Sequence, residues 1–402
     1  MRKFNKYVLF VLVLLMATAL VACGGNTDSQ PAPSGDNSGG TKAPITVNIG
    51  YSGPLSGPAA FYGEKTLAGL EMAINEINDD GGFEIDGQPY NLNLVSLDDQ
   101  YMPNNTGANA QRLVQEHETP IVFIPHSGGI FAAQTSNVEN NMLIAAYTSE
   151  PALVEIGNPL TMQIPNPYSG YLPPFVKYGM EKHGKKAATL ATATQYGKDW
   201  TELFVEEWEA QGGEIVFPGS IDFNKDTDFF TIVTNALKEK PDVLFIGGAS
   251  PQAAMVAKQA RELGFKGGFI IIDQAKMDEM VDVLGSWDAL EGSVGVVPLQ
   301  FSDFPGTARF LDLFGSLYGE VPGSEAGYHY VSTFILVEAM KAAGTVSDAK
   351  AIRDALPQAI KNLPDQYKVY DILEIRDDGG FRIEYRLGVV ENGEFKALGE
   401  FH

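Results

Sequence analysis

The chain has 402 residues, 44% of them hydrophobic, and it carries 28 basic against 51 acidic residues, a formal net charge of −23. This length and apolar content suffice for a buried core and favour two domains over one. So negative a surface repels phosphate groups, which argues against nucleic acid as a partner.

The first residues have the layout of a bacterial signal peptide. Three basic residues precede an apolar run over 7–22, which is short for a helix that crosses a membrane. The run ends at Cys23, the only cysteine, which two glycines follow. This arrangement resembles the bacterial lipobox, so residues 1–22 are expected to be removed and Cys23 to carry a lipid. The alternatives are an ordinary signal peptide and an uncleaved anchor. A single cysteine excludes an intramolecular disulfide.

Residues 23–44 are expected to form a flexible tether. From residue 24 to 43 the chain is small and polar, without a large apolar side chain, so it cannot bury enough surface to offset the entropy of ordering. The expected location is extracytoplasmic, with the folded body anchored by lipid to the bacterial cell membrane, on the cell surface or in the periplasm.

From Ile45 onwards the pattern alternates between strands and helices. The run Ile121–Ile124 is apolar throughout, as is typical of a strand buried on both faces of a parallel sheet. Predicted strands cover 45–51, 92–97, 121–124 and 142–146, and predicted helices cover 67–77, 106–116 and 132–140.

The alternation then restarts, with strands predicted over 187–191, 243–246 and 269–272, and helices over 200–210, 229–238 and 251–263. Residues 304–356 are predicted to be mostly helical, and 372–401 to form strands and turns. Two runs of this kind predict an α/β fold with two doubly wound, Rossmann-like lobes rather than one long sheet.

Three crossings between the lobes are expected, near 164–167, 296–298 and 370–373, and they would act as a hinge. Lobe 1 is predicted to comprise residues 45–165 and 297–372, and lobe 2 residues 166–296 and 373–402.

Signatures of catalysis and metal binding are missing from the sequence. There is no phosphate-binding loop, no dinucleotide-binding glycine motif and no nucleophile elbow. His126 precedes Ser127, but adjacent residues at a strand end point in different directions, which disfavours a hydrolase dyad. The five histidines lack the paired spacing of a metal site. Neither a metal nor a cofactor is expected, and the protein is predicted not to be an enzyme.

One stretch is specific for a known family: Ser52-Gly53-Pro54, Tyr62-Gly63, Ile77-Asn78 and Gly81-Gly82, with further matches at Gln195-Tyr196-Gly197 and Gly247-Gly248. In these motifs the chain, from about Ile45 to its end, resembles the leucine/isoleucine/valine-binding proteins. Those are type I periplasmic solute-binding proteins that feed ABC importers. The resemblance implies a two-lobed body that closes on a small-molecule ligand and docks on an ABC permease in the membrane.

The resemblance also implies where the ligand binds. In amino-acid-binding members, main-chain N–H groups and hydroxyls at two strand ends of the first lobe hold the carboxylate, and an acidic side chain of the second lobe meets the ammonium. Here Asp273 stands at the acidic position, with a solvated loop aspartate as the alternative. The other implied ligand-binding residues are Tyr62, Ser127, Gly128, Tyr147, Thr148, Ser149 and Tyr196.

The roles of two serines, the shape of the pocket, the ligand and the function each have an alternative interpretation. Ser127 and Ser149 are also residue types that cap helices. Ala249 stands where leucine-type binders carry a tyrosine, and Tyr147 where they carry a small residue, so the pocket is expected to differ in shape. An amino acid, branched-chain or related, is the favoured ligand, with amides, urea and aromatic acids as alternatives. A sensory receptor of the same fold and an exported enzyme are the rival functions.

Overall fold

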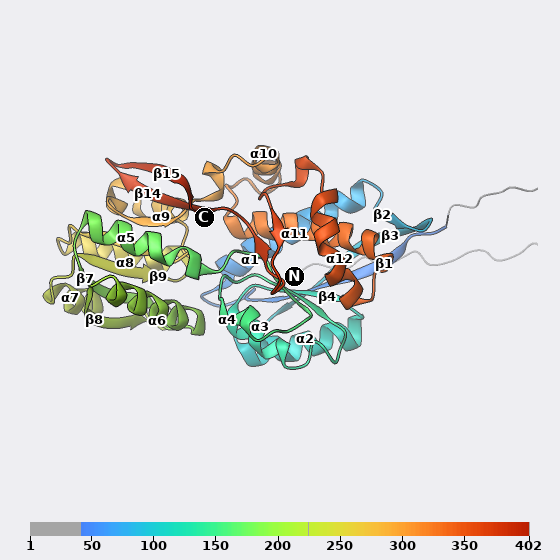
Figure 1. Cartoon of the computed structure of the whole chain (residues 1–402), viewed down its shortest axis with the longest axis horizontal. Coiled ribbons are helices and arrows are strands. Elements are labelled where there is room, and N and C mark those ends of the chain that lie inside the picture. The colour runs from blue at the N-terminus through green and yellow to red at the C-terminus, as the bar shows by residue number, and fades with distance from the viewer. Residues whose placement is uncertain (1–41, 224, 402) are drawn as a thin grey trace, which may run out of the picture. The chain divides into compact units, whose positions relative to one another are not determined.

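The structure is a computed structural model that describes residues 42–223 and 225–401 (Figure 1). The predicted signal peptide, Cys23 and nearly all of the predicted tether lie outside the described residues. The described part contains two large mixed sheets with helices on both faces of each. Within it, no helix is long and apolar enough to cross a membrane.

The first sheet has the strand order β2-β3-β1-β4-β5-β6, all parallel except the β2–β3 hairpin. Its strands are β1 (Ile45–Gly53), β2 (Phe83–Ile85), β3 (Gln88–Asp98), β4 (Ile121–Ile124), β5 (Leu143–Ala146) and β6 (Thr161–Gln163). Its helices include α1 (Ala60–Asp79), α2 (Pro103–His117), α3 (Ser127–Gln134), α4 (Ala152–Glu155), α10 (Thr307–Tyr318), α11 (Ser324–Ala343) and α12 (Ala349–Asn362).

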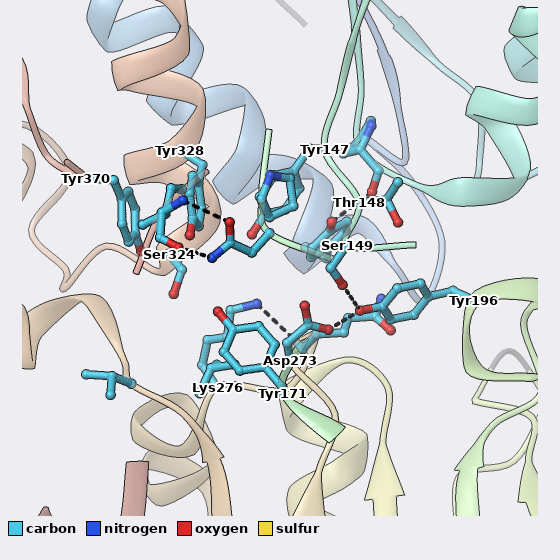
Figure 2. A pocket seen from close by; sticks show the side chains of 18 of the residues that line it. Tyr147, Thr148, Ser149, Tyr171, Tyr196, Asp273, Lys276, Ser324, Tyr328 and Tyr370 are labelled. Carbon is cyan, nitrogen blue, oxygen red and sulfur yellow. Dashed lines mark hydrogen bonds between the residues drawn. The ribbon is translucent and has the colours of Figure 1, made fainter. Parts of the chain in front are cut away.

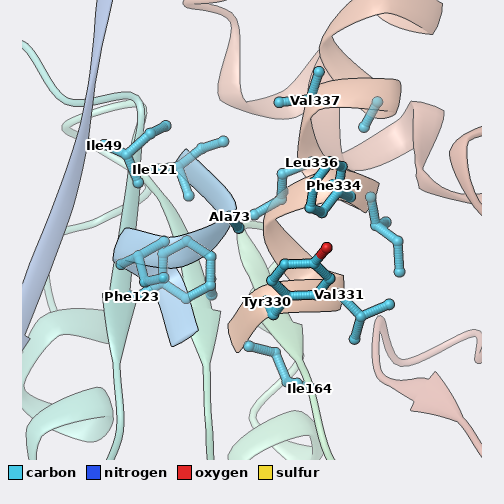
Figure 3. Packing of buried hydrophobic residues seen from close by; sticks show 14 of the residues in the cluster. Ile49, Ala73, Ile121, Phe123, Ile164, Tyr330, Val331, Phe334, Leu336 and Val337 are labelled. Atoms are coloured by element: carbon cyan, nitrogen blue, oxygen red, sulfur yellow. The ribbon is translucent and has the colours of Figure 1, made fainter. Parts of the chain in front are cut away.

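The β4 strand explains why this sheet is covered on both sides. Ile121 and Phe123 belong to the core cluster formed with α1, α11 and α12, whereas Val122 and Ile124 belong to the cluster formed with α2 and α3. Successive side chains of a strand point to opposite faces, so an apolar run of four residues needs a helical layer on each face. Figure 3 shows the first of these clusters, in which β4 packs against α1 and α11.

The second sheet has the order β15-β14-β11-β10-β9-β7-β8, in which β14 and β15 are antiparallel. Its strands are β7 (Lys186–Thr192), β8 (Glu214–Ile221), β9 (Val243–Gly247), β10 (Gly268–Ile271), β11 (Val294–Val296), β14 (Tyr385–Glu391) and β15 (Glu394–Phe401). One core cluster joins it to α5 (Leu172–Lys182) and α6 (Gln195–Ala210), and another to α7 (Phe230–Lys238), α8 (Ser250–Glu262) and α9 (Met277–Leu284). We call the units built on the first and second sheets lobe 1 and lobe 2.

The helix expected over 132–140 is wrong in position. In the structure α3 begins at Ser127, two residues beyond the end of β4, because the His126 side chain accepts a hydrogen bond from the Gly129 N–H and caps the helix. The helix ends at Gln134, and Asn137 beyond it donates to the carbonyl oxygens of Met142 and Leu160. These long-range partners hold residues after 134 in turns, which local periodicity does not reveal.

The chain passes from the lobe 1 core to the lobe 2 core between Ile164 and Tyr168, and returns between Val296 and Leu299. The third passage differs from the expected one near 370–373. The hairpin β12 (Glu374–Ile375) and β13 (Phe381–Arg382) still packs on lobe 1, because Phe381 and Ile383 are buried in its core. We therefore place the last lobe boundary after Ile383.

Candidate functional site

A cavity lies between the two lobes, where the carboxyl ends of their parallel strands face each other. In lobe 1 the strand order changes direction between β1 and β4, and in lobe 2 between β7 and β9, and such switch points form crevices that take ligands. The cavity is partly open to solvent, and side chains of both lobes line it, as is usual for a site that takes a small molecule. Figure 2 shows its lining side chains.

Lobe 1 contributes a pair of hydroxyls at the ends of β4 and β5. The Ser127 Oγ lies 2.8 Å from the Thr148 Oγ1, and both side chains are buried. Ser127 is also the first residue of α3, where main-chain N–H groups lack partners within the helix. One hydroxyl of the pair donates to the other, so a second proton stays available for an acceptor. This corner of the cavity can therefore bind an anion.

His126, next to Ser127, has a structural role. Its Nδ1 accepts from the Gly129 N–H at 3.0 Å, so Nε2 carries the proton and donates to the Asp99 Oδ2 at 3.0 Å. Asp99 is fully buried and also accepts from the Thr106 hydroxyl at 2.8 Å. Both ring nitrogens are thus occupied, and neither is available to activate Ser127.

Lobe 2 contributes Asp273, which follows β10, and Tyr196 at the start of α6. The Tyr196 hydroxyl donates to the Asp273 Oδ1 and accepts from the Trp200 Nε1 at 3.0 Å. Burial raises the pKa of Tyr196 well above its ordinary value, and the nearby carboxylate raises it further. The hydroxyl therefore keeps its proton for Asp273, and the hydrogen bond fixes the carboxylate at the cavity wall.

Ser149 connects the two lobes. Its Oγ lies 2.7 Å from the Tyr196 Oη. Figure 2 marks this contact with a dashed line. Because the Tyr196 proton goes to Asp273 and Trp200 donates to the same oxygen, Ser149 must be the donor in its contact with Tyr196. The Ser149 proton is therefore used between the lobes in this state.

Aromatic rings line much of the remaining wall. Tyr62, whose hydroxyl donates to the Pro125 oxygen at 2.8 Å, lies 6.4 Å from Tyr147 between ring centroids. Tyr328 and Tyr370 stack at 3.8 Å with almost parallel planes. Seven tyrosines line the cavity: Tyr62, Tyr101, Tyr147, Tyr171, Tyr196, Tyr328 and Tyr370. Tyrosine rings can enclose the apolar part of a ligand, and their hydroxyls can contact its polar groups.

The structure brings seven of the eight predicted site residues to the cavity: Tyr62, Ser127, Tyr147, Thr148, Ser149, Tyr196 and Asp273. Gly128 does not line it. A Cβ there would lie 2.9 Å from the Pro103 Cγ, so this glycine faces α2 and allows the helices to approach. Ala249 also lies outside the cavity lining, at the start of α8.

The helix-capping alternative for the two serines is wrong. His126 caps α3, and Pro151 precedes α4 without a side-chain cap, so neither Ser127 nor Ser149 is an N-cap. The sequence prediction also missed several lining residues, among them Lys276, Ser324 and Tyr328. Their only sequence signal is a position near the start of α9 or α11, which by itself does not place them at a shared cavity.

Comparison with known proteins yields one family. The sequence profile of the family described as "Periplasmic binding protein" matches residues 46–390. The Leu/Ile/Val-binding protein of Citrobacter freundii is 25% identical over 268 residues, which span 66% of this chain and 71% of that protein.

Solved structures agree in fold. A leucine-binding protein of Thermotoga maritima has a TM-score of 0.75 at 18% identity, covering 89% of this chain and 99% of that one. The branched-chain amino acid binding protein of Streptococcus pneumoniae, solved in complex with isoleucine, has a TM-score of 0.73 at 22% identity, with the same coverage. The described body therefore has the type I periplasmic binding protein fold.

Proposed function

Because this chain belongs to the periplasmic binding protein family, we propose that it captures an amino acid, branched-chain or related, between its two lobes and delivers it to an ABC permease. The observation that carries the proposal is that one side of the cavity can bind an anion and the other side can bind a cation. An anion-binding corner lies on lobe 1 at Ser127 and Thr148, and a carboxylate lies on lobe 2 at Asp273. An α-amino acid has a carboxylate and an ammonium to match them.

We assign the ligand carboxylate to the free hydroxyl proton of the Ser127–Thr148 pair and to the first N–H groups of α3. The ammonium meets the Asp273 carboxylate, which the Tyr196 hydroxyl holds at the cavity wall. The side chain lies among the tyrosine rings. Ser149 contributes by closure rather than by donation, since its proton serves Tyr196. This differs from the role that the family resemblance implied for Ser149.

The direct test is a thermal-shift screen of the purified protein against amino acids, neutral amides, urea and small aromatic acids. A ligand at 100 times its dissociation constant stabilises the folded state by about 2.7 kcal/mol. Amino acids should raise the melting temperature, and Asp273→Asn should remove that shift, because the ammonium loses its charged partner. Stabilisation by amides or aromatic acids, with none by amino acids, would refute the assignment.

The function is capture without chemistry. Relatives of this chain bind solutes, and both nitrogens of His126 are occupied by structural hydrogen bonds. The ligand should be recovered unchanged after incubation with the protein. Turnover that Ser127→Ala abolishes would establish an enzyme instead, and signalling through a membrane kinase in place of uptake would establish a receptor.

Lipid attachment at Cys23 is part of the proposal and concerns residues outside the described structure. A tethered binding protein stays near its permease, which raises the effective concentration of the pair. In cell fractionation the parent should stay with the membrane and Cys23→Ser should be released. Retention of the variant would argue against the lipid anchor.

A further inference from the structure

Four charged side chains, three of them buried and one partly buried, meet where α1 and α11 of lobe 1 face the start of α9 in lobe 2. The Lys65 Nζ of lobe 1 lies 3.4 Å from the Glu279 Oε1 of lobe 2. The Lys276 Nζ of lobe 2 lies 3.6 Å from the Glu325 Oε2 of lobe 1. Each lobe thus provides one cation and one anion, and both ion pairs cross the cleft. We call these residues the charge quartet.

The quartet is compact and almost dry. The side chains of Lys276 and Glu325 are 4% and 2% exposed, and those of Lys65 and Glu279 are 8% and 11% exposed. A Cβ built on Gly323 would lie 2.7 Å from both the Glu279 Oε1 and the Glu325 Oε2, so the two carboxylates approach the same point. The two carboxylates are therefore close neighbours, and each has a lysine of the opposite lobe within 3.6 Å.

The carboxylates depend on the lysines for compensation. Within the described residues, the Glu279 Oε1 and the Glu325 Oε2 have no hydrogen-bond partner, although Ser250 donates to the other oxygen of Glu279 at 2.6 Å. A buried charge without an opposite charge is strongly unfavourable, whereas a paired one is tolerated. Each glutamate therefore needs a nearby cation, and in both ion pairs this cation is a lysine of the opposite lobe.

We propose that the charge quartet stabilises the closed arrangement of the two lobes. The ligand-free protein therefore samples the closed form, and changes to these residues shift the equilibrium between the open and closed forms. When the lobes separate, both ion pairs break, but all four groups gain water, so the open form stays accessible. Lys65, Glu279 and Glu325 do not line the cavity, so their effect on affinity passes through closure. Lys276 lines the cavity and joins the quartet to the ligand site. The effect on ligand affinity rests on the proposed function, whereas closure without ligand does not.

The test measures lobe separation without ligand, by spin-label distances between Lys350→Cys on lobe 1 and Lys198→Cys on lobe 2, in the full chain with Cys23→Ser. Both labelled positions are exposed, on α12 and α6. Lys65→Met should reduce the short-distance population at least about tenfold, because it leaves Glu279 buried without its partner in the closed form only. The matched control is Arg382→Met, which removes one partner of an exposed ion pair with Glu374.

The double variant Lys65→Met/Glu279→Leu tests whether Lys65→Met opens the lobes because it leaves the Glu279 carboxylate unpaired, or because it changes the packing around residue 65. Replacing a buried ion pair by apolar residues of similar size is often neutral, so the double variant should regain the closed population that Lys65→Met loses. Ligand affinity should follow the same order across the variants.

Two results would overturn the proposal: a parent with long distances only, or a double variant as open as the single one. If Lys65→Met fails to fold, Glu325→Gln replaces it, because it removes the charge that pairs with Lys276 of lobe 2. An unchanged distance distribution in Glu325→Gln would then refute the coupling. If the distances respond as expected but no amino acid binds, the quartet stands and the proposed function fails.

Discussion

Tyr196→Phe separates the contacts that fold lobe 2 from the one that closes the cleft. The substitution keeps the ring and removes a hydroxyl with three partners, of which Asp273 and Trp200 belong to lobe 2 and Ser149 to lobe 1. Two of these hydrogen bonds persist when the lobes open, so they contribute to folding. Only the 2.7 Å contact with Ser149 is confined to the closed form.

The magnitudes follow from this division. Loss of one neutral hydrogen bond costs about 0.5–1.5 kcal/mol, and about 1.4 kcal/mol changes an equilibrium tenfold, so loss of the Ser149 contact by itself should raise the dissociation constant about 2- to 12-fold. The free energy of unfolding should fall by about 1–3 kcal/mol, because the buried Trp200 Nε1 is left without its acceptor. Calorimetric titration gives the first quantity and denaturant unfolding the second.

Tyr51→Phe is the matched control. Tyr51 is fully buried in lobe 1, and its hydroxyl lies 3.0 Å from the Gly63 oxygen and 2.6 Å from the Thr66 Oγ1. Its loss should lower stability and leave the dissociation constant unchanged. The reasoning is refuted if Tyr196→Phe binds ligand as tightly as Tyr51→Phe does.

Two further predictions concern stability. Burial raises the pKa of Glu150 to about 7, so its contribution to folding is present below its ordinary pKa and is lost as the pH rises through 7. Glu150→Gln should therefore gain up to about 3 kcal/mol of unfolding free energy relative to the parent between pH 4.5 and 8, and a constant difference would contradict the shift. Gly69→Ala should destabilise the fold by about 1–3 kcal/mol, because its Cβ would lie 2.1 Å from the Ala326 oxygen where α1 meets α11. Gly315→Ala, with its nearest contact at 3.8 Å, is the control and should melt no lower than the parent.

The sequence was informative where local chemistry decides the structure. The Ile121–Ile124 run predicted a strand with both faces buried, and the structure has β4 over the same residues. The family resemblance implied Asp273 as a ligand-binding residue, and in the structure this residue lies at the cavity, just after β10. The family resemblance followed from motifs in both lobes, the most specific of them in the first, and the profile match over residues 46–390 confirms the family.

What local patterns did not reveal depends on contacts between distant segments. The last lobe boundary was wrong because Phe381 and Ile383 are buried by helices that come earlier in the chain. The charge quartet joins residues 65 and 325 of lobe 1 to residues 276 and 279 of lobe 2, and no spacing in the sequence relates one pair to the other. Likewise, the direction of the Ser149 proton follows only once Tyr196, Asp273 and Trp200 are seen around one oxygen.

The most direct test of the central claim compares one amino acid with analogues that each lack one charge. Calorimetric titration would use the tightest-binding amino acid, its methyl ester, and the acid that keeps the same side chain but has no amine. The account predicts that each analogue binds at least about 100-fold more weakly, because buried polar groups of the site are then left unpaired. Binding of the amine-free acid as tight as that of the amino acid would contradict the role of Asp273 and, with it, amino acid capture.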